Sequence, residues 1–345
     1  MFVAYSDKHL LHAPKQIIFR GRIFDNVEAP ARATELAAAA RAAGCQLAAP
    51  REFGLEPVLS VHTSAYVEFL QTAYARWRAM FGDAGAGPSV VPHASPTRFP
   101  ARLPQAIQGQ VGYFLAGTSA PIEENTWPAI QASADCALEV SSRLLEGMRE
   151  GYAICRPAGH HAYADVAGGY CYLNNAAIAA EQIARRQGKV AVLDIDVHHG
   201  NGTQNIFYRR GDVLFVSIHG DPNEVYPFYS GYADEQGEDD GKDCNLNLPL
   251  PKGSKDAGFL EALNVALAAI TRFGAPSLVL SLGFDAHEDD PQSEMAVTNQ
   301  CFYEVGLRIA TLGLATAIIQ EGGYYIPGLA SNLTAFLDGF KAGRT

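Results

Sequence analysis

The side chains best suited to chemistry in this sequence are aspartates, histidines and a tyrosine that gather in a few short runs. In the densest run, Asp196 and His198 stand two residues apart, so in an extended segment both side chains point the same way. Asp285 supplies a third group from a distant run, and carboxylate and imidazole both ligate zinc. Three protein ligands with an open position are typical of a catalytic zinc site, and this hard O, N, O set also suits Fe(II) or Co(II).

Acid–base chemistry is predicted at the adjacent pair His160 and His161, because imidazole titrates close to neutral pH. Asp194 is expected to orient one ring and Asn201 the other. A carboxylate partner favours the charged imidazole more than an amide does, so the two histidines are expected to titrate differently. Tyr324 follows two glycines and could donate a hydrogen bond to an oxyanion, a role whose loss typically costs about 10²–10³ in rate.

Each of these runs follows a predicted strand. Short apolar, β-branched strand candidates lie at Phe2–Tyr5, Tyr152–Cys155, Val190–Asp194, Val213–Ile218, Asn245–Leu248, Leu278–Leu282 and Ala315–Gln320. Helix candidates lie between them, over roughly 31–43, 63–80, 128–149, 174–187, 256–272, 299–312 and 328–342. The alternation predicts an α/β fold with a mostly parallel, multi-stranded sheet and helices on both faces. Ligands bind at the carboxyl ends of such strands, so the chemical runs are expected to converge on one rim.

Two regions interrupt this alternation and are predicted to be long loops, which are often functional. Residues 82–107 are rich in glycine, proline and alanine. Residues 229–243 are acidic and are interpreted as a solvated surface excursion. His287, Glu288 and Asp289, which follow Asp285, are interpreted as rim loop residues and not as a second metal cluster. Neither long loop resembles an interdomain linker, so residues 1–345 are expected to form a single domain.

Composition narrows the class of protein. Hydrophobic residues make up 48% of the 345 residues and charged residues 18%, a balance typical of a folded protein. The formal net charge of −11 argues against nucleic acid and anionic membranes as partners and favours cationic small molecules. Six cysteines without a C-x-x-C pair, no long apolar run and no signal-like N-terminus indicate a cytoplasmic protein.

Five motifs follow one another along the chain. They are Arg156-Pro-Ala-Gly-His-His, Gly168-Gly-Tyr-Cys-Tyr-Leu-Asn-Asn, Asp194-Ile-Asp-Val-His-His-Gly-Asn-Gly-Thr, Ser281-Leu-Gly-Phe-Asp and Glu321-Gly-Gly-Tyr. In kind and order they resemble the histone deacetylase superfamily, and the resemblance covers nearly the whole chain. The opening Phe2-Val-Ala-Tyr-Ser-Asp-Lys-His, the segment Glu28-Ala-Pro-Ala-Arg32 and the loop 82–107 resemble the bacterial acetylpolyamine amidohydrolases within that superfamily.

The resemblance implies an arginase/deacetylase α/β fold and a zinc-dependent hydrolysis of small N-acetylated amines to acetate and free amine. It implies zinc on Asp196, His198 and Asp285, with His160 and His161 as the acid/base pair and Tyr324 as the oxyanion donor. It also implies the roles of several further residues, namely Gly169, Tyr170 and Tyr226 along the substrate tunnel, Asp194, Asp196 and Ser217 around a potassium ion, and Arg32 behind the metal. The long loop implies a homodimer in which the partner narrows the tunnel.

One segment departs from this pattern. Gln108 and Ser119 stand where the polyamine enzymes carry carboxylates, and Glu123 and Glu124 follow without an assigned place. The chain length of the amine therefore stays open.

A protein or peptide acetyl-lysine deacetylase is an alternative with the same chemistry. A binuclear manganese ureohydrolase is more remote because Gly200 replaces the carboxylate of an Asp-x-His-x-Asp run, and a non-catalytic acylamine-binding protein is the last alternative.

Overall fold

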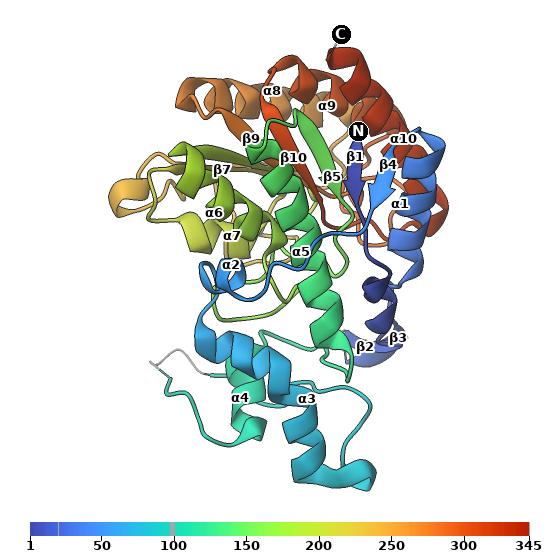
Figure 1. Cartoon of the computed structure of the whole chain (residues 1–345), viewed down its shortest axis with the longest axis vertical. Helices are drawn as coiled ribbons and strands as arrows, with labels where there is room; N and C mark the ends of the chain where they lie inside the picture. Colours follow the sequence, from blue (N-terminus) through green and yellow to red (C-terminus); the bar gives the residue numbers. More distant parts are fainter. Residues whose placement is uncertain (20, 97–100, 345) are drawn as a thin grey trace.

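The computed structural model describes residues 1–19, 21–96 and 101–344. Eight strands form one parallel sheet in the order β4-β1-β5-β10-β9-β6-β7-β8 (Figure 1). They are β1 (Phe2–Ala4), β4 (Gln46–Ala48), β5 (Glu150–Ala153), β6 (Val190–Asp194), β7 (Val213–Gly220), β8 (Asn245–Leu250), β9 (Ser277–Leu282) and β10 (Ala315–Gln320). The seven predicted strands are confirmed. The short edge strand β4 and the separate antiparallel hairpin of β2 (Gln16–Phe19) and β3 (Arg22–Asp25) were not predicted.

All seven predicted helices form. The described helices are α1 (Ala31–Ala42), α2 (Glu56–Leu59), α3 (Ser64–Gly85), α4 (Ile107–Phe114), α5 (Thr126–Leu145), α6 (Asn175–Gln187), α7 (Asn201–Phe207), α8 (Asp256–Phe273), α9 (Asn299–Thr311) and α10 (Ile326–Gly343). The short helices α2, α4 and α7 were not predicted. The predicted loop 82–107 includes 97–100, which lie outside the described residues, and its ends belong to α3 and α4.

Helices cover both faces of the sheet, and the alternation of side chains along each strand explains how. In β6, Ala191 and Leu193 pack with α1, α8, α9 and α10, while Val190 and Val192 pack with α5 and α6. Because the strand is buried on both faces, every residue of it must be apolar until Asp194, its last. The predicted α/β fold, with helices on both faces of a parallel sheet, is therefore confirmed.

A third apolar cluster lies beyond the carboxyl edge of the sheet, where α3 and α4 pack against one end of α5 (Figure 1). Phe69 and Phe114 are in ring contact there, with centroids 4.9 Å apart.

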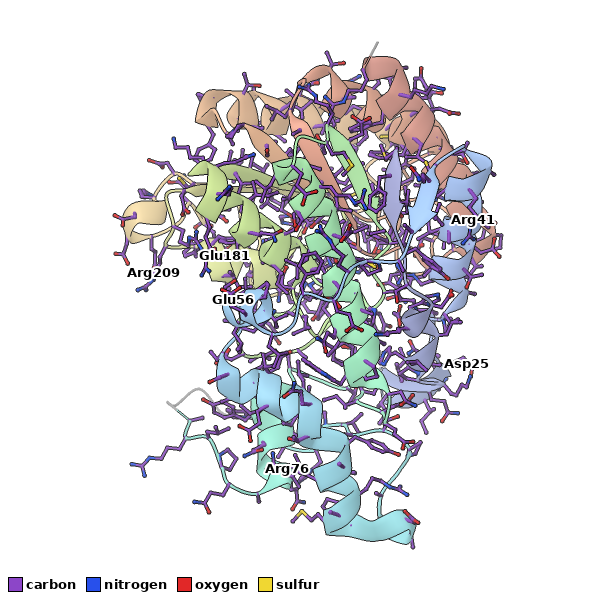
Figure 2. All side chains as sticks on the ribbon, viewed as in Figure 1. Asp25, Arg41, Glu56, Arg76, Glu181 and Arg209 are labelled. Carbon is purple, nitrogen blue, oxygen red and sulfur yellow. The ribbon has the colours of Figure 1, made fainter. Side chains whose placement is uncertain are left out.

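Charged side chains such as Asp25 and Arg209 point outward from the ribbon (Figure 2). Among the described helices, none combines the length and hydrophobicity that crossing a bilayer requires.

The tightest helix packing joins α9 and α10 at Gly339, where a Cβ atom would lie 1.9 Å from the carbonyl oxygen of Tyr303. Gly339→Ala should therefore force the helices apart and lower the free energy of unfolding by about 1–3 kcal/mol. Gly258→Ala in α8 is the matched control, because nothing lies within 4 Å of its added Cβ, and it should be neutral or stabilising by up to about 1 kcal/mol. Equal stability of the two variants in urea denaturation would contradict this packing.

Candidate active site

The predicted convergence of the chemical runs is confirmed. β5, β10, β9 and β6 are neighbours in the parallel sheet, so the residues that follow them meet at one carboxyl edge. His198 lies at the centre of this edge, with Nδ1 3.1 Å from Asp196 Oδ1 and 3.3 Å from Asp285 Oδ2. One ligand atom from each of the three residues lies within 4.8 Å of the others.

Hydrogen bonds hold the two carboxylates but leave one oxygen free. Asp196 Oδ2 accepts a hydrogen bond from the Gly322 amide at 2.7 Å, and Asp285 Oδ1 accepts one from the Val197 amide at 3.1 Å. Asp285 Oδ2 is buried, and within the described part of the chain it has the His198 Nδ1 atom at 3.3 Å as an ion-pair neighbour but no well-aligned hydrogen-bond donor. A buried anionic oxygen without a donor is costly unless a cation neutralises it, so these three residues fit a divalent metal.

The electrostatics of the three residues point the same way. Burial and the charge of Asp196 raise the pKa of Asp285 to about 7. Burial opposes a charged His198, but the two carboxylates of Asp196 and Asp285 beside its Nδ1 atom outweigh burial and raise the pKa of His198 to about 10. Two buried carboxylates in contact with one imidazole thus demand a positive charge, which a metal supplies when the imidazole is neutral.

The two neighbouring histidines pair as predicted. His160 Nδ1 lies 2.9 Å from Asp194 Oδ2, and His161 Nδ1 lies 2.7 Å from Asn201 Oδ1. Burial would lower the pKa of His160, but the charges of Asp194 and Asp196 hold it well above its usual value. Burial and the charges of nearby histidines hold the pKa of His161 well below its usual value. These opposite directions agree with the predicted difference in titration, because only His160 has a carboxylate partner.

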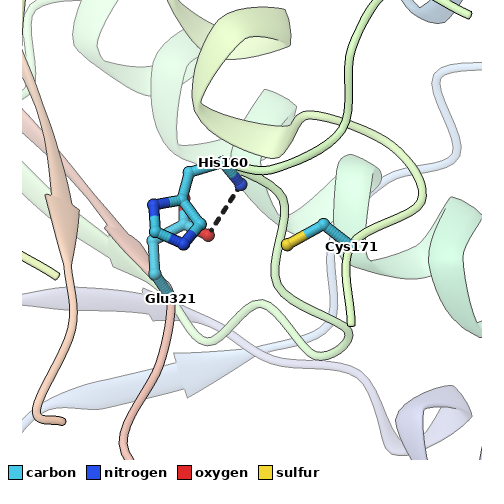
Figure 3. Close-up of side chains that lie close together, drawn as sticks. All are labelled: His160, Cys171 and Glu321. Atoms are coloured by element: carbon cyan, nitrogen blue, oxygen red, sulfur yellow. Dashed lines mark hydrogen bonds between the residues drawn. The ribbon is translucent and has the colours of Figure 1, made fainter. Parts of the chain in front are cut away.

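A second cluster of possible metal ligands consists of His160, Cys171 and Glu321 (Figure 3). Glu321 Oε2 already accepts hydrogen bonds from the backbone amides of Gly159 and His160, at 2.8 and 3.1 Å. Burial raises the pKa of the Cys171 thiol well above its usual value, whereas a metal ligand must be a thiolate. Glu321 therefore anchors the histidine segment to the end of β10, and the cluster does not fit a metal.

Two contacts hold Tyr324 in place at the site. Its ring lies beside the Arg32 guanidinium, with the Arg32 Cζ atom 4.6 Å from the ring centroid. Its backbone amide donates to Asp290 Oδ2 at 2.6 Å. Burial raises the pKa of Tyr324 well above its usual value, so the phenol stays protonated and is a hydrogen-bond donor. Asp290 was not anticipated, and its place five residues after Asp285 carries no distinguishing signal.

A cavity of about 380 Å³ opens beside these residues, and its walls include His161, Gly169, Tyr170, His198, Tyr226 and Tyr324. The backbone of Gly169 lies so close to His161 that a Cβ atom there would be 2.3 Å from the ring. Tyr170 adopts a φ of 64°, a conformation that costs a residue other than glycine roughly 1–2 kcal/mol. The predicted tunnel residues thus lie together, and close packing around His161 fixes their backbone.

Other wall residues of the cavity were missed. Ile17 and Ile18 come from the β2–β3 hairpin, and Glu224 and Glu294 come from loops near Tyr226 and Asp285. Ser119 also lines the cavity, while Glu123 accepts a hydrogen bond from Ser89 instead. No spacing in the sequence marks these positions, because loops bring them together only in the folded chain.

The remaining predicted residues lie close by. Ser217 is the register neighbour of Asp194 across β6 and β7, and its hydroxyl lies 2.8 Å from His219 Nδ1. His287 was expected on the rim but is buried, because its ring packs nearly parallel to those of Phe302 and Tyr325, with centroids 6.5 and 6.0 Å away. The adjoining Glu288 and Asp289 are exposed, as expected for rim residues.

Arg32 itself depends on a buried carboxylate. Glu28 Oε1 accepts from Arg32 at 2.9 Å, and Glu28 Oε2 accepts from Arg156, also at 2.9 Å. Arg32 in turn donates to the carbonyl oxygens of Glu321 and Gly323, at 2.6 and 2.5 Å. Burial opposes ionisation of Glu28, but the charges of Arg156 and Arg32 outweigh it and lower its pKa. This carboxylate therefore fixes the turn that carries Tyr324.

Glu28→Gln should lower the free energy of unfolding by about 3–5 kcal/mol at pH 7, because it leaves two buried guanidinium groups without a carboxylate. In the folded protein the pKa of Glu28 lies below its ordinary value of 4.5, so the stability that Glu28 contributes is complete above pH 4.5. The difference between wild type and variant should shrink as the pH falls below 4.5.

Glu139→Gln is the matched control, because its partners Arg51 and Arg143 are 55% and 42% exposed and remain hydrated when the charge is removed. It should destabilise the protein less than Glu28→Gln in urea titrations. A loss for Glu28→Gln no larger than for this control would contradict the structural role given to Glu28.

Comparison with known proteins places this geometry in a family. Residues 26–340 match the family model described as "Histone deacetylase domain". The acetylpolyamine amidohydrolase of Burkholderia pseudomallei (strain 1710b) is 45% identical over 99% of both chains. Acetylpolyamine amidohydrolase 1 of Pseudomonas aeruginosa is 44% identical over 99% of both. The crystal structure of acetylpolyamine aminohydrolase from Burkholderia pseudomallei superposes with a TM-score of 0.96 at 45% identity and covers 100% of both chains. The chain therefore belongs to the histone deacetylase family of hydrolytic enzymes.

Proposed function

We propose that this protein hydrolyses the amide bond of a small N-acetylated diamine or polyamine and releases acetate and the free amine. The observation that carries the proposal is the buried group of Asp196, His198 and Asp285, in which Asp285 Oδ2 has no well-aligned donor, next to a cavity that His198 and Tyr324 line. The names of the relatives support the substrate class. The whole chain, residues 1–345, is proposed to act as one catalytic domain.

Asp196, His198 and Asp285 would hold one zinc ion, with Fe(II) or Co(II) as substitutes that the hard donor set tolerates. Zinc bound there would lower the pKa of a water molecule and polarise the substrate carbonyl. Gly200 lies against the Asp194 carboxylate, where an added Cβ would be 2.2 Å from Oδ2, so there is no room for the carboxylate that a binuclear site needs. Asp194, Asp196 and Ser217 would hold a structural potassium ion.

The chain's own residues divide the proton transfers. His161 lines the cavity and favours the neutral imidazole, so it takes the proton from the attacking water and later delivers it to the leaving amine. His160 stays charged beside Asp194 and lies behind that ring. The Tyr324 phenol donates a hydrogen bond to the carbonyl oxygen as it becomes negative. Gly169, Tyr170 and Tyr226 form the walls that orient the aliphatic chain of the amine.

The cavity is suited to a cationic amine. Within the described residues the Glu224 carboxylate on its wall has no ion-pair partner, whereas Glu294 pairs with Lys252. An ammonium group at the far end of a linear substrate would supply that partner, and the net charge of −11 would attract it. Glu224 thereby supplies the negative charge for the substrate that the polyamine enzymes have at the positions of Gln108 and Ser119.

The protein is also proposed to be a cytoplasmic homodimer. All six cysteines are free, which suits a reducing compartment. Met80 and Leu103, near the two ends of the long loop 82–107, are 50% and 44% exposed. Exposed apolar side chains of this kind favour contact with a second copy of the chain, which would narrow the cavity and disfavour folded protein substrates.

Tyr324→Phe should retain one zinc per chain and lose about 10²–10³ in kcat, because the oxyanion loses a donor while the ligands are untouched. Asp285→Asn is the matched variant, and it should lose both activity and zinc. Metal content measured by plasma mass spectrometry alongside acetate release separates the two cases. Normal turnover by Tyr324→Phe would refute the role of its hydroxyl.

A substrate panel tests the amine. Acetylputrescine and acetylcadaverine should have higher kcat/KM values than an acetyl-lysine peptide and than uncharged N-butylacetamide. Glu224→Gln should raise KM for the acetylated diamines, by up to about tenfold for one solvent-accessible ion pair, and leave N-butylacetamide unchanged. A preference for the acetyl-lysine peptide would instead establish a protein or peptide deacetylase.

A further inference from the structure

We propose that Asp290 is a positioning residue for the reaction: with Arg32 it fixes the peptide group between Gly323 and Tyr324 and so sets where the Tyr324 hydroxyl lies. The oxygen of this peptide group accepts from Arg32 Nε at 2.5 Å, and its N–H donates to Asp290 Oδ2 at 2.6 Å. One peptide group is therefore held between a cation and an anion. The inference rests on the proposed function only for the catalytic use of the hydroxyl, because these contacts are independent of any reaction.

This peptide group is the adjustable part of the link that carries Tyr324. On one side β10, inside the sheet, ends at Gln320, and on the other α10, packed against α9, begins at Ile326. Gly323 lies between them with a φ of 119° and has no Cβ atom, so its own sterics restrict the following peptide group very little. Contacts from elsewhere in the chain must therefore select its orientation.

The two charged side chains make that selection. Because a trans peptide group is planar, its oxygen and its hydrogen point in opposite directions, and a rotation breaks both hydrogen bonds at once. Arg32 and Asp290 are both buried, so water does not replace either partner after a rotation. Hydrogen bonds to charged groups are also roughly twice as strong as those between neutral groups. The observed orientation is thus strongly preferred, although glycine would permit others.

Asp290 can serve as a fixed point because backbone groups hold its carboxylate. Its Oδ1 atom accepts from the Gln292 amide at 2.9 Å, and its Oδ2 atom accepts from the Tyr325 amide, also at 2.9 Å, in addition to that of Tyr324. All three partners are backbone N–H groups, which can only donate. Asp290 also belongs to the loop that begins with the proposed metal ligand Asp285, so it ties the turn of the phenol to the loop of the metal.

The same carboxylate joins the phenol to a wall of the cavity. Pro291 and Gln292, which follow Asp290 directly, line the cavity together with Tyr324. A hydrogen-bond donor to an oxyanion must lie about 2.7–3.1 Å from the position that the oxygen will occupy. A misplacement of about 1 Å can cost roughly 10²-fold in rate. Asp290 is therefore expected to affect kcat far more than KM.

Asp290→Asn in the zinc-loaded protein, assayed with acetylputrescine, tests the inference. The substitution keeps the volume but leaves a single acceptor oxygen, so the amides of Tyr324 and Gln292 cannot both keep their partner. We expect kcat to fall about tenfold to a hundredfold, with KM nearly unchanged and one zinc retained per chain. Asp290→Ala removes both acceptor oxygens and should lose at least as much.

A double-mutant cycle with Tyr324→Phe separates positioning from a general structural loss. The phenylalanine variant has no hydroxyl to place, so adding Asp290→Asn to it should cause no further loss of kcat. A purely structural effect of Asp290→Asn would instead lower kcat by the same factor in both backgrounds.

Two controls match the substitution. Asp289→Asn removes the neighbouring carboxylate, which is 60% exposed, and should leave kcat unchanged. Asp135→Asn alters a buried carboxylate that accepts from the Phe53 backbone amide at 3.2 Å away from the cavity. It should lower stability in urea titrations, as Asp290→Asn does, and leave kcat unchanged.

Hydrogen exchange in the wild type tests the contacts without any variant. The amide hydrogens of Tyr324 and Tyr325, followed by NMR, should exchange as slowly as those of β10, although they lie in a turn. Asp290→Asn should accelerate their exchange and leave that of β10 unchanged. Exchange of the Tyr324 amide in the wild type at the rate of an exposed loop amide would overturn the inference.

The inference would also be overturned by an Asp290→Asn enzyme with the kcat of the wild type, by loss of its zinc, or by equal losses of kcat in the two backgrounds. The proposed function is judged separately by hydrolysis of acetylated diamines by the wild type. Slow exchange at Tyr324 without such hydrolysis would refute the proposed function and leave the fixed peptide group established. Hydrolysis with equal losses in both backgrounds would give the reverse result.

Discussion

The structure depends on bringing two carboxylates together inside the protein. Asp196 and Asp285 follow adjacent parallel strands and are both fully buried, with His198 in contact with each. Such an arrangement is unfavourable without a cation, because buried like charges repel and Asp285 Oδ2 has no well-aligned hydrogen-bond donor among the described residues. A divalent cation removes both penalties at once. We interpret the other residues at the carboxyl edge of the sheet as the framework that holds the two negatively charged side chains in place.

That framework consists of buried ion pairs and backbone donors. Arg32, held by Glu28, fixes the turn between Glu321 and Tyr324, and Glu321 ties the same turn to the histidine segment. An added Cβ at Gly322 would lie 2.0 Å from Asp285 Oδ2, so only glycine lets the strand end approach the carboxylates. The same set of contacts therefore fixes both the Tyr324 phenol and the metal ligands Asp196 and Asp285.

The sequence was informative where chemistry follows a strand. The buried strand β6 ends at Asp194, and the alternation of apolar strands and helices placed its polar continuation at the carboxyl edge beside the ends of β5, β9 and β10. The partners of His160 and His161 were also predictable, because Asp194 and Asn201 stand in the run that ends β6 and continues past it at the same edge. These inferences depend on local periodicity and on the general behaviour of parallel sheets.

What the sequence did not reveal depends on loops and side-chain directions. Asp290, Glu28 and Glu224 act across turns whose paths no local pattern specifies. The acidic loop looked like a solvated surface because its composition is charged, yet Glu235 points inward and accepts three donors. Strand β4 and the β2–β3 hairpin are short or exposed and give weak signals.

The central claim concerns where a metal binds, and anomalous diffraction from crystals of the zinc-loaded protein measures that directly. Data collected on either side of the zinc absorption edge should give one strong peak within bonding distance of Asp196, His198 and Asp285. A peak at His160, Cys171 and Glu321, or no ordered peak at the end of β6 in a zinc-loaded and active enzyme, would contradict the account.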